Sequence, residues 1–162
     1  MRLMLPFVLA WAATLVAQSQ SAAPPVRSIR DGAYTAEQAD RGQALYNVSC
    51  AYCHMADLQG NPPIGKDVST NAPSRSSRPP QTAPGSSSAL AGPGFVGNWE
   101  GLSLGDLYER IRISMPQDSP GSLSRQTNAD ITAFMLKANG YSAGPNELTV
   151  MKAALDEIRI VR

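Results

Sequence analysis

One short segment, Cys50-Ala-Tyr-Cys53-His54, carries the residue types that do chemistry. It holds the only two cysteines and the only histidine of the 162-residue chain. Two sulfurs one helical turn apart can each form a thioether with one of the two vinyl groups of a haem, and the adjoining imidazole then faces the iron. The segment therefore predicts one haem c, attached covalently through Cys50 and Cys53, with His54 as the proximal ligand.

Three other uses of this segment compete with haem attachment. A thioredoxin-like dithiol belongs in a strand–helix–strand context, and the sequence has no convincing strand. A zinc site needs a fourth ligand, and no further cysteine or histidine exists to supply it. The third alternative is an inert local disulfide. An exported protein suits covalent attachment best, because a thioether-bound cofactor cannot be lost in an open, oxidising compartment.

The ligand on the opposite face of the iron is found by elimination among the six methionines. Five lie in the predicted export signal, beside the proximal ligand, on an apolar helical stripe or in the tail: Met1, Met4, Met55, Met135 and Met151. Met115 remains, in a loop that a following proline stiffens. We expect Met115 to bind the iron; the alternative is an exposed methionine in a loop.

A helix should begin after Thr35 and lead into the attachment segment. Thr35-Ala-Glu-Gln38 has the spacing of a capping box, in which both side chains satisfy free backbone N–H groups. Apolar and small residues then recur on one face at helical spacing: Ala39, Gly42, Leu45 and Tyr46. Glycine is costly inside a helix, so Gly42 predicts a close crossing by another helix.

Two further helices are expected downstream, with an apolar cluster at Phe95, Val96 and Trp99 before them. Ser103 caps a helix whose apolar positions are Leu104, Leu107, Tyr108 and Ile111. The last main helix covers about 128–139, with Asn139-Gly140 as its stop. The tail, 141–162, adds at most a short helix. The elements predict an all-α fold with three main helices around one haem.

The chain divides into segments of different composition. Residues 1–22 have the layout of a secretory signal peptide, one arginine before a short apolar run and small residues at its end. The alternative is a retained membrane anchor, although the run is short for a bilayer span. Residues 23–34 read as a polar tether, 35–140 as the haem domain and 141–162 as an extension. Within the domain, 61–92 is a Pro/Ser/Gly-rich insert and reads as a long surface loop.

The charge balance excludes a general nucleic-acid binder. The formal net charge is +1, from 14 basic and 13 acidic residues, whereas proteins that bind phosphate backbones concentrate positive charge. The same balance predicts weak long-range steering of any protein partner. A membrane is a partner only if the signal segment is retained.

With these motifs in place, the chain resembles a monohaem class I cytochrome c over about residues 35–148, apart from the insert. The matching features are Gly42 and Tyr46, the Cys50–His54 motif, Phe95 to Trp99, Met115-Pro116 and Phe134. The resemblance implies that the first and last main helices cross near Gly42 and Phe134. It also implies that Trp99 lies near a haem propionate; plain core packing is the alternative for Trp99.

The resemblance further implies a backbone carbonyl that accepts the Nδ1–H of His54. The insert leaves Gly60, Pro62 and Pro63 as candidates for it. The run from Met115 to Gly140 is similar to small cytochromes, and cytochrome domains, associated with bacterial quinoprotein alcohol dehydrogenases.

An iron with His and Met on its two faces exchanges an electron and has no open position for substrate. The sequence therefore predicts a periplasmic one-electron carrier that is not itself an enzyme. Its partners would be a redox donor and a redox acceptor, among them a quinoprotein dehydrogenase or a respiratory chain. The alternatives are a small peroxidase or gas sensor with a labile Met115, and a haem-free dithiol oxidoreductase.

Overall fold

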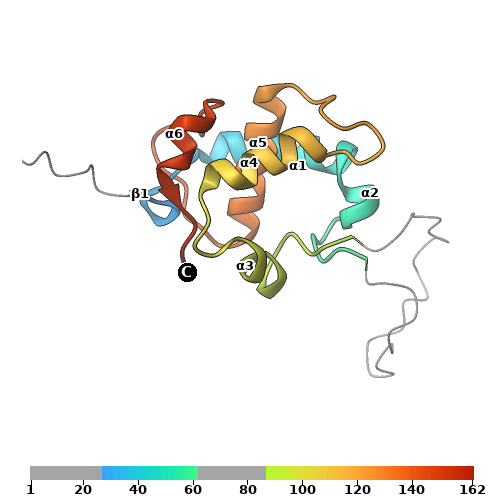
Figure 1. Ribbon diagram of the computed structural model, residues 1–162, viewed down its shortest axis with the longest axis horizontal. Helices are drawn as coiled ribbons and strands as arrows, with labels where there is room; N and C mark the ends of the chain where they lie inside the picture. The colour runs from blue at the N-terminus through green and yellow to red at the C-terminus, as the bar shows by residue number, and fades with distance from the viewer. Residues whose placement is uncertain (1–26, 62–86) are drawn as a thin grey trace, which may run out of the picture.

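Helices make up about half of the described residues and all of the larger elements among them, as the sequence predicts. A computed structural model describes residues 27–61 and 87–162, so the predicted signal peptide and the middle of the insert lie outside the described residues. The helices are α1 (Ala36–Ser49), α2 (Ala51–His54), α3 (Pro93–Trp99), α4 (Leu104–Ser114), α5 (Arg125–Ala138) and α6 (Lys152–Asp156) (Figure 1). No helix in these two stretches has the length and apolar character that a bilayer crossing requires.

The start of α1 confirms one half of the expected capping box and corrects the other. The Thr35 hydroxyl accepts a hydrogen bond from the Gln38 N–H at 3.2 Å, which caps the helix. The Gln38 amide does not return to the cap. It is fully buried, donates to the Leu148 carbonyl at 3.0 Å and accepts from the Leu148 N–H at 2.6 Å. This side chain therefore joins α1 to the C-terminal segment.

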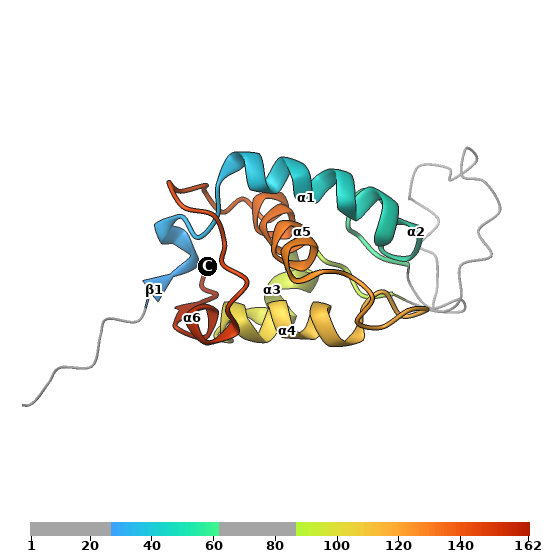
Figure 2. The same cartoon turned by 90° about the horizontal axis from the view of Figure 1, so that it is seen from above.

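The crossing of α1 and α5 is the main helix–helix contact that positions the site. Both Gly42 and Tyr46 on α1 are buried against α5, as predicted from Gly42. The ring centroids of Tyr46 and Phe134 lie 5.2 Å apart, with their planes tilted by 52°. Seen from above, α1 and α4 run along the two long sides with α5 between them (Figure 2).

Helix α4 has the cap and the buried face that the sequence predicts. The Ser103 hydroxyl accepts from the Asp106 N–H at 3.0 Å, and the Asp106 carboxylate accepts from the Ser103 N–H at 3.0 Å. Its apolar stripe from Leu104 to Ile111 is buried. Helix α5 begins three residues earlier than expected, because Ser124 caps it by accepting from the Thr127 N–H at 3.0 Å.

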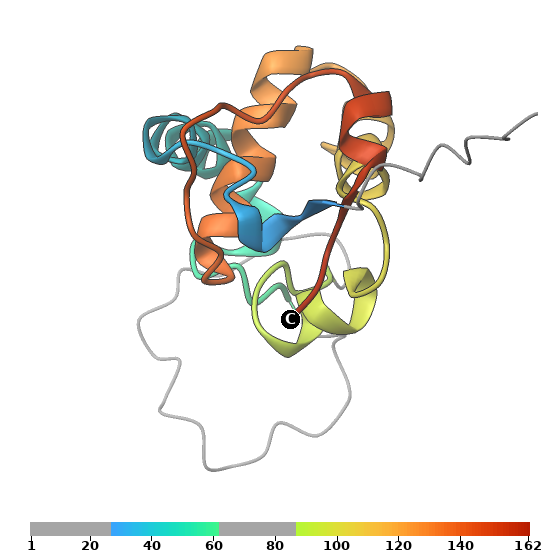
Figure 3. The ribbon, with the colours of Figure 1, turned by 90° about the vertical axis from the view of Figure 1, so that its left-hand side faces the viewer.

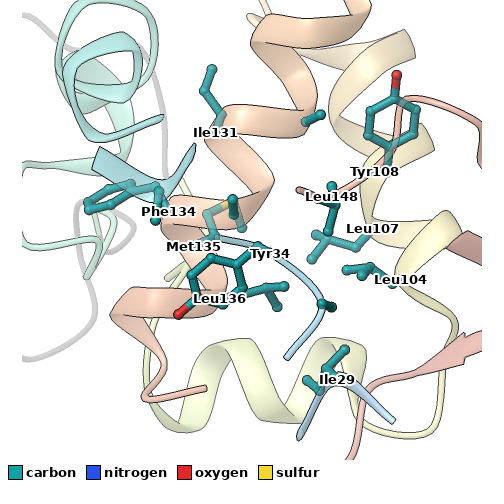
Figure 4. Packing of buried hydrophobic residues seen from close by; sticks show 14 of the residues in the cluster. Ile29, Tyr34, Leu104, Leu107, Tyr108, Ile131, Phe134, Met135, Leu136 and Leu148 are labelled. Atoms are coloured by element: carbon teal, nitrogen blue, oxygen red, sulfur yellow. The ribbon is translucent and has the colours of Figure 1, made fainter. Parts of the chain in front are cut away.

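One apolar core joins these helices. Residues of α4 and α5 meet the N-terminal segment within it, and Figure 4 shows Leu104, Leu107, Ile131 and Met135 in the same cluster as Tyr34. Met135 is only 2% exposed, so its side chain belongs to this core. The position of Met135 in the sequence predicts the same role.

The C-terminal extension holds the expected short helix, α6, whereas the N-terminal segment differs from the expected tether. Within the predicted tether, Ile29 and Tyr34 are buried, and Ile29–Asp31 forms a short 3₁₀ helix. Strand β1 (Arg27–Ser28) pairs in parallel with β2 (Ile158–Arg159), and the two segments lie side by side in Figure 3. The tether prediction is therefore wrong for residues 27–34, because their apolar side chains complete the core.

Candidate haem-attachment site

The two cysteines lie at the two ends of one helical turn. Helix α1 ends at Ser49, and the Cys50 N–H still donates to the Tyr46 carbonyl at 2.8 Å. The Cys50 carbonyl in turn accepts from the N–H groups of Cys53 at 3.1 Å and His54 at 2.9 Å, which closes the turn of α2. Residues three apart in a helical turn project from the same side, so this turn favours two sulfurs that face one region. That spacing suits two thioethers to one porphyrin.

The cysteine side chains are partly buried and not joined to each other. Both are free thiols of intermediate exposure, and Cys50 packs against the core. Burial, and to a lesser degree the neighbouring Cys53, raises the pKa of Cys50 to about 11. The Cys50 sulfur is therefore a neutral thiol at pH 7 before any attachment. A reactive redox dithiol needs the opposite shift.

The imidazole of His54 is oriented by a single backbone carbonyl. His54 Nδ1 lies 2.9 Å from the carbonyl oxygen of Ser88. A carbonyl can only accept, so Nδ1 carries the proton and Nε2 is left as the ligating nitrogen. The acceptor is therefore Ser88 and not the expected Gly60, while Pro62 and Pro63 lie outside the described residues. The acceptor comes from the far end of the insert, which no local pattern in the sequence indicates.

The two ends of the insert meet beside the attachment motif. Asn61 and Ser87 form an antiparallel bridge, with N–H to carbonyl distances of 3.1 and 3.0 Å. Farther along, the Leu90 N–H donates to the Leu58 carbonyl at 2.7 Å. The ends of the expected 61–92 loop are thus part of the packed protein. We call the four residues Gly60, Asn61, Ser87 and Ser88 the neck of the insert.

Tyr46 fixes the backbone directly after His54. Its ring is fully buried, and its hydroxyl donates to the Met55 carbonyl at 2.7 Å. Met55 has φ 64°, a left-handed conformation that turns the chain sharply after the histidine. Burial raises the pKa of Tyr46, so the phenol remains a neutral donor.

Met115 lies where α4 ends. Its N–H donates to the Ile111 carbonyl at 3.0 Å, and its half-buried side chain packs against the core. The segment that follows α4 lies at the same end of the molecule as α2 in Figures 1 and 2. The amide of Asn128 on α5 holds the far end of that loop by donating to the Leu123 carbonyl at 3.2 Å. Iron ligation by Met115 stays a prediction.

The other methionines of the described chain are less suitable ligands. Met135 is enclosed in the core, and Met55 directly follows the proximal histidine. Met151 is 64% exposed and precedes α6, which lies at the end of the molecule away from α2 (Figure 2). These positions agree with the reasons for which the sequence favours Met115.

Trp99 is the last residue of α3 and is half-buried against the core. Its carbonyl accepts from the Leu102 N–H at 3.0 Å, which turns the chain toward α4. A contact with a haem propionate remains a prediction, and core packing remains its alternative.

The donor set fits a c-type haem. Two thiols one turn apart and an imidazole with its Nδ1 already bonded are the groups that such a haem needs from its proximal side.

Comparisons with known proteins give one family and one solved structure. Residues 37–135 match the family model described as "Cytochrome C oxidase, cbb3-type, subunit III". A solved structure that matches is the crystal structure of the sulfane dehydrogenase SoxCD from Paracoccus pantotrophus, at 26% identity and a TM-score of 0.36. The match covers 83% of this chain and 61% of that one. A search of curated proteins found no match.

Proposed function

Because the chain belongs to the cytochrome c family described as cytochrome C oxidase, cbb3-type, subunit III, we propose that it is a one-electron carrier with His54 and Met115 as axial ligands. The chain is a class I c-type cytochrome with an all-α fold, and it carries one haem c attached through Cys50 and Cys53. When bound, the haem supplies one-electron exchange between ferric and ferrous iron.

The observation that carries the proposal is the hydrogen bond between His54 Nδ1 and the Ser88 carbonyl. It fixes the tautomer and the orientation of the ring, so Nε2 is the nitrogen that would bind the iron of an attached haem. The Tyr46 hydroxyl, bonded to the Met55 carbonyl, limits movement of the chain after the histidine. A rigid proximal side keeps the rearrangement during electron transfer small.

The residues around Met115 support a fixed distal ligand. The backbone N–H of Met115 is bound to the Ile111 carbonyl of α4, and part of the Met115 side chain packs against the core. A thioether on the second face favours ferrous iron and closes the position that a substrate would need. A carrier function follows from that closure.

We place this carrier in the periplasm, because an arginine, an apolar run and small residues begin the sequence. A cytochrome c domain requires a redox donor and a redox acceptor. We propose a dehydrogenase as the donor, which the similarity of the Met115–Gly140 run to cytochromes of quinoprotein dehydrogenases supports. Contacts between electron-transfer proteins are small and transient, and the near-neutral charge of this chain predicts that its contacts depend only weakly on salt.

The ferric absorption spectrum tests the ligand assignment. The protein is expressed with the haem attachment machinery, purified and oxidised. We expect the weak charge-transfer band of a methionine–iron bond at the red edge of the spectrum, and no binding of carbon monoxide by the reduced protein.

A missing band together with ready binding of carbon monoxide would contradict the carrier and favour a peroxidase or gas sensor. A colourless protein of bare polypeptide mass would instead favour the dithiol oxidoreductase. The raised pKa of Cys50 already argues against that last function.

A further inference from the structure

The Ser87 hydroxyl joins two backbone segments that are distant in the sequence. Its Oγ donates to the Cys53 carbonyl at 2.6 Å and accepts from the Asn61 N–H at 2.9 Å. One end of this connection is the attachment motif, and the other is Asn61 in the first half of the neck. The side chain is partly buried, so water competes only partly for these bonds.

Gly60 allows the two segments of the neck to approach this closely. It has φ +67°, and a Cβ placed there would overlap the Ser87 carbonyl oxygen and lie 2.8 Å from that of Ser88. Its N–H donates to the His54 carbonyl at 3.1 Å. The neck is thus built against the last turn of α2.

We propose that Ser87 is a positioning residue for the haem iron, whose hydroxyl fixes the neck so that the Ser88 carbonyl stays on His54 Nδ1 and sets the reduction potential. This inference rests on the proposed function, since it takes His54 as the axial ligand. Ser87 does not touch the iron or its ligand ring. It acts through the neighbouring carbonyl, one residue along the chain.

The hydroxyl matters because α2 and the neck have few hydrogen bonds of their own. Helix α2 has four residues, so its final carbonyl groups have no partners within the helix. Ser87 supplies a partner to Cys53, and through Asn61 it also closes the neck. Without that hydroxyl, only the backbone bridge holds the Ser88 carbonyl in place.

The direction of the effect follows from the chemistry of imidazole. A carbonyl that accepts the Nδ1–H makes Nε2 a stronger electron donor, which stabilises ferric iron. A looser neck weakens this donation and favours ferrous iron. We therefore expect Ser87→Ala to raise the reduction potential.

The experiment compares three variants of the haem-loaded protein by spectroelectrochemical titration. Ser87→Ala removes the hydroxyl, Ser87→Thr retains one, and Ser88→Ala removes an exposed side chain but keeps the accepting carbonyl. For Ser87→Ala we expect a shift of the one-electron equilibrium toward ferrous iron by about three- to tenfold, the range that one ordinary hydrogen bond is worth. Ser88→Ala and Ser87→Thr should stay near the wild type.

A second measurement separates positioning from general stability. The exchange rate of the His54 Nδ1 proton, followed by NMR, should rise in Ser87→Ala and not in Ser88→Ala. A merely structural serine would lower the melting temperature without moving the potential or this exchange rate.

An unchanged potential in Ser87→Ala, with the methionine–iron band intact in the wild type, would overturn the role of Ser87 alone. Equal shifts in Ser87→Ala and Ser88→Ala would also overturn it. The absence of the band in the wild type would instead defeat the proposed ligand set, so the two failures are distinguishable.

Discussion

Gly42 on α1 lies directly against the backbone of Asp130 on α5. A Cβ at Gly42 would overlap the Asp130 carbonyl oxygen and come within 3.0 Å of the Phe134 Cβ. The two helices therefore touch backbone to backbone, one turn before Tyr46 meets Phe134. Since Tyr46 also holds the residue after His54, this crossing positions the proximal side of the site.

Replacing this glycine should separate the helices. We expect Gly42→Ala to lower the free energy of unfolding by about 3 kcal/mol, at the upper end of the usual cost of overpacking, because the clash is with backbone. Urea unfolding followed by circular dichroism measures it. Gly97→Ala on α3 is the matched control, since a Cβ there meets nothing within 4 Å. Equal stability of Gly42→Ala and Gly97→Ala would contradict the close crossing.

The buried amide of Gln38 should contribute more to the stability of the fold than a residue in the first turn of a helix usually does. Gln38→Ala leaves the buried N–H and carbonyl of Leu148 without partners, which costs about 2–4 kcal/mol of unfolding free energy. Gln43→Ala, on the exposed face of the same helix, should change it by less than about 0.5 kcal/mol. Similar effects of the two substitutions in urea unfolding would show that the Gln38–Leu148 pair does not stabilise the fold.

The capping box of α4 predicts a specific dependence on pH. Hydrogen bonds from the Ser103 side chain and backbone lower the pKa of Asp106 below its unfolded value. The stabilisation is therefore present above the unfolded pKa, near 4, and is lost as the pH falls through the folded pKa. Asp106→Asn should be about 1 kcal/mol less stable than the wild type at pH 7, and the difference should vanish near pH 2.

Urea unfolding at several pH values checks this difference. Asp118→Asn, in the exposed loop after α4, should stay within about 0.5 kcal/mol of the wild type at pH 7. A stability difference for Asp106→Asn that does not depend on pH would contradict the capping role of its carboxylate.

Removing the proposed distal ligand should change both the coordination of the iron and its reduction potential. Met115→Ala should open the sixth position, so the ferrous variant binds carbon monoxide and the methionine–iron band disappears. Axial ligands set haem potentials over about 0.8 V, and we expect this loss to lower the potential by on the order of 0.1 V. Met151→Ala, which alters an exposed methionine, should leave the spectrum and potential unchanged. A retained band in Met115→Ala would show that another group binds the iron.

The sequence predicts the parts of the fold that local patterns determine. Thr35 and Ser103 cap their helices as expected, and Gly42 marks the crossing with α5. These features depend on residues three or four positions apart, or on a steric requirement that only glycine meets. The attachment motif is equally local, which is why its five residues alone are enough to predict the haem.

Contacts between distant backbone groups are not predictable in this way. Gln38 suits a capping box by its spacing, yet it pairs with Leu148, 110 residues away. The Ser88 carbonyl reaches His54 only because the neck closes the insert, and any residue type can offer a carbonyl. The burial of Ile29 likewise depends on strand pairing with the other end of the chain, which its polar neighbours conceal.

Reversible spectroelectrochemical titration of the purified, haem-loaded protein is the decisive measurement for the proposed one-electron carrier. We expect a single one-electron curve, with a six-coordinate, low-spin spectrum in both the ferric and the ferrous state. A protein with no redox-active chromophore, or one whose iron changes coordination on reduction, would contradict it.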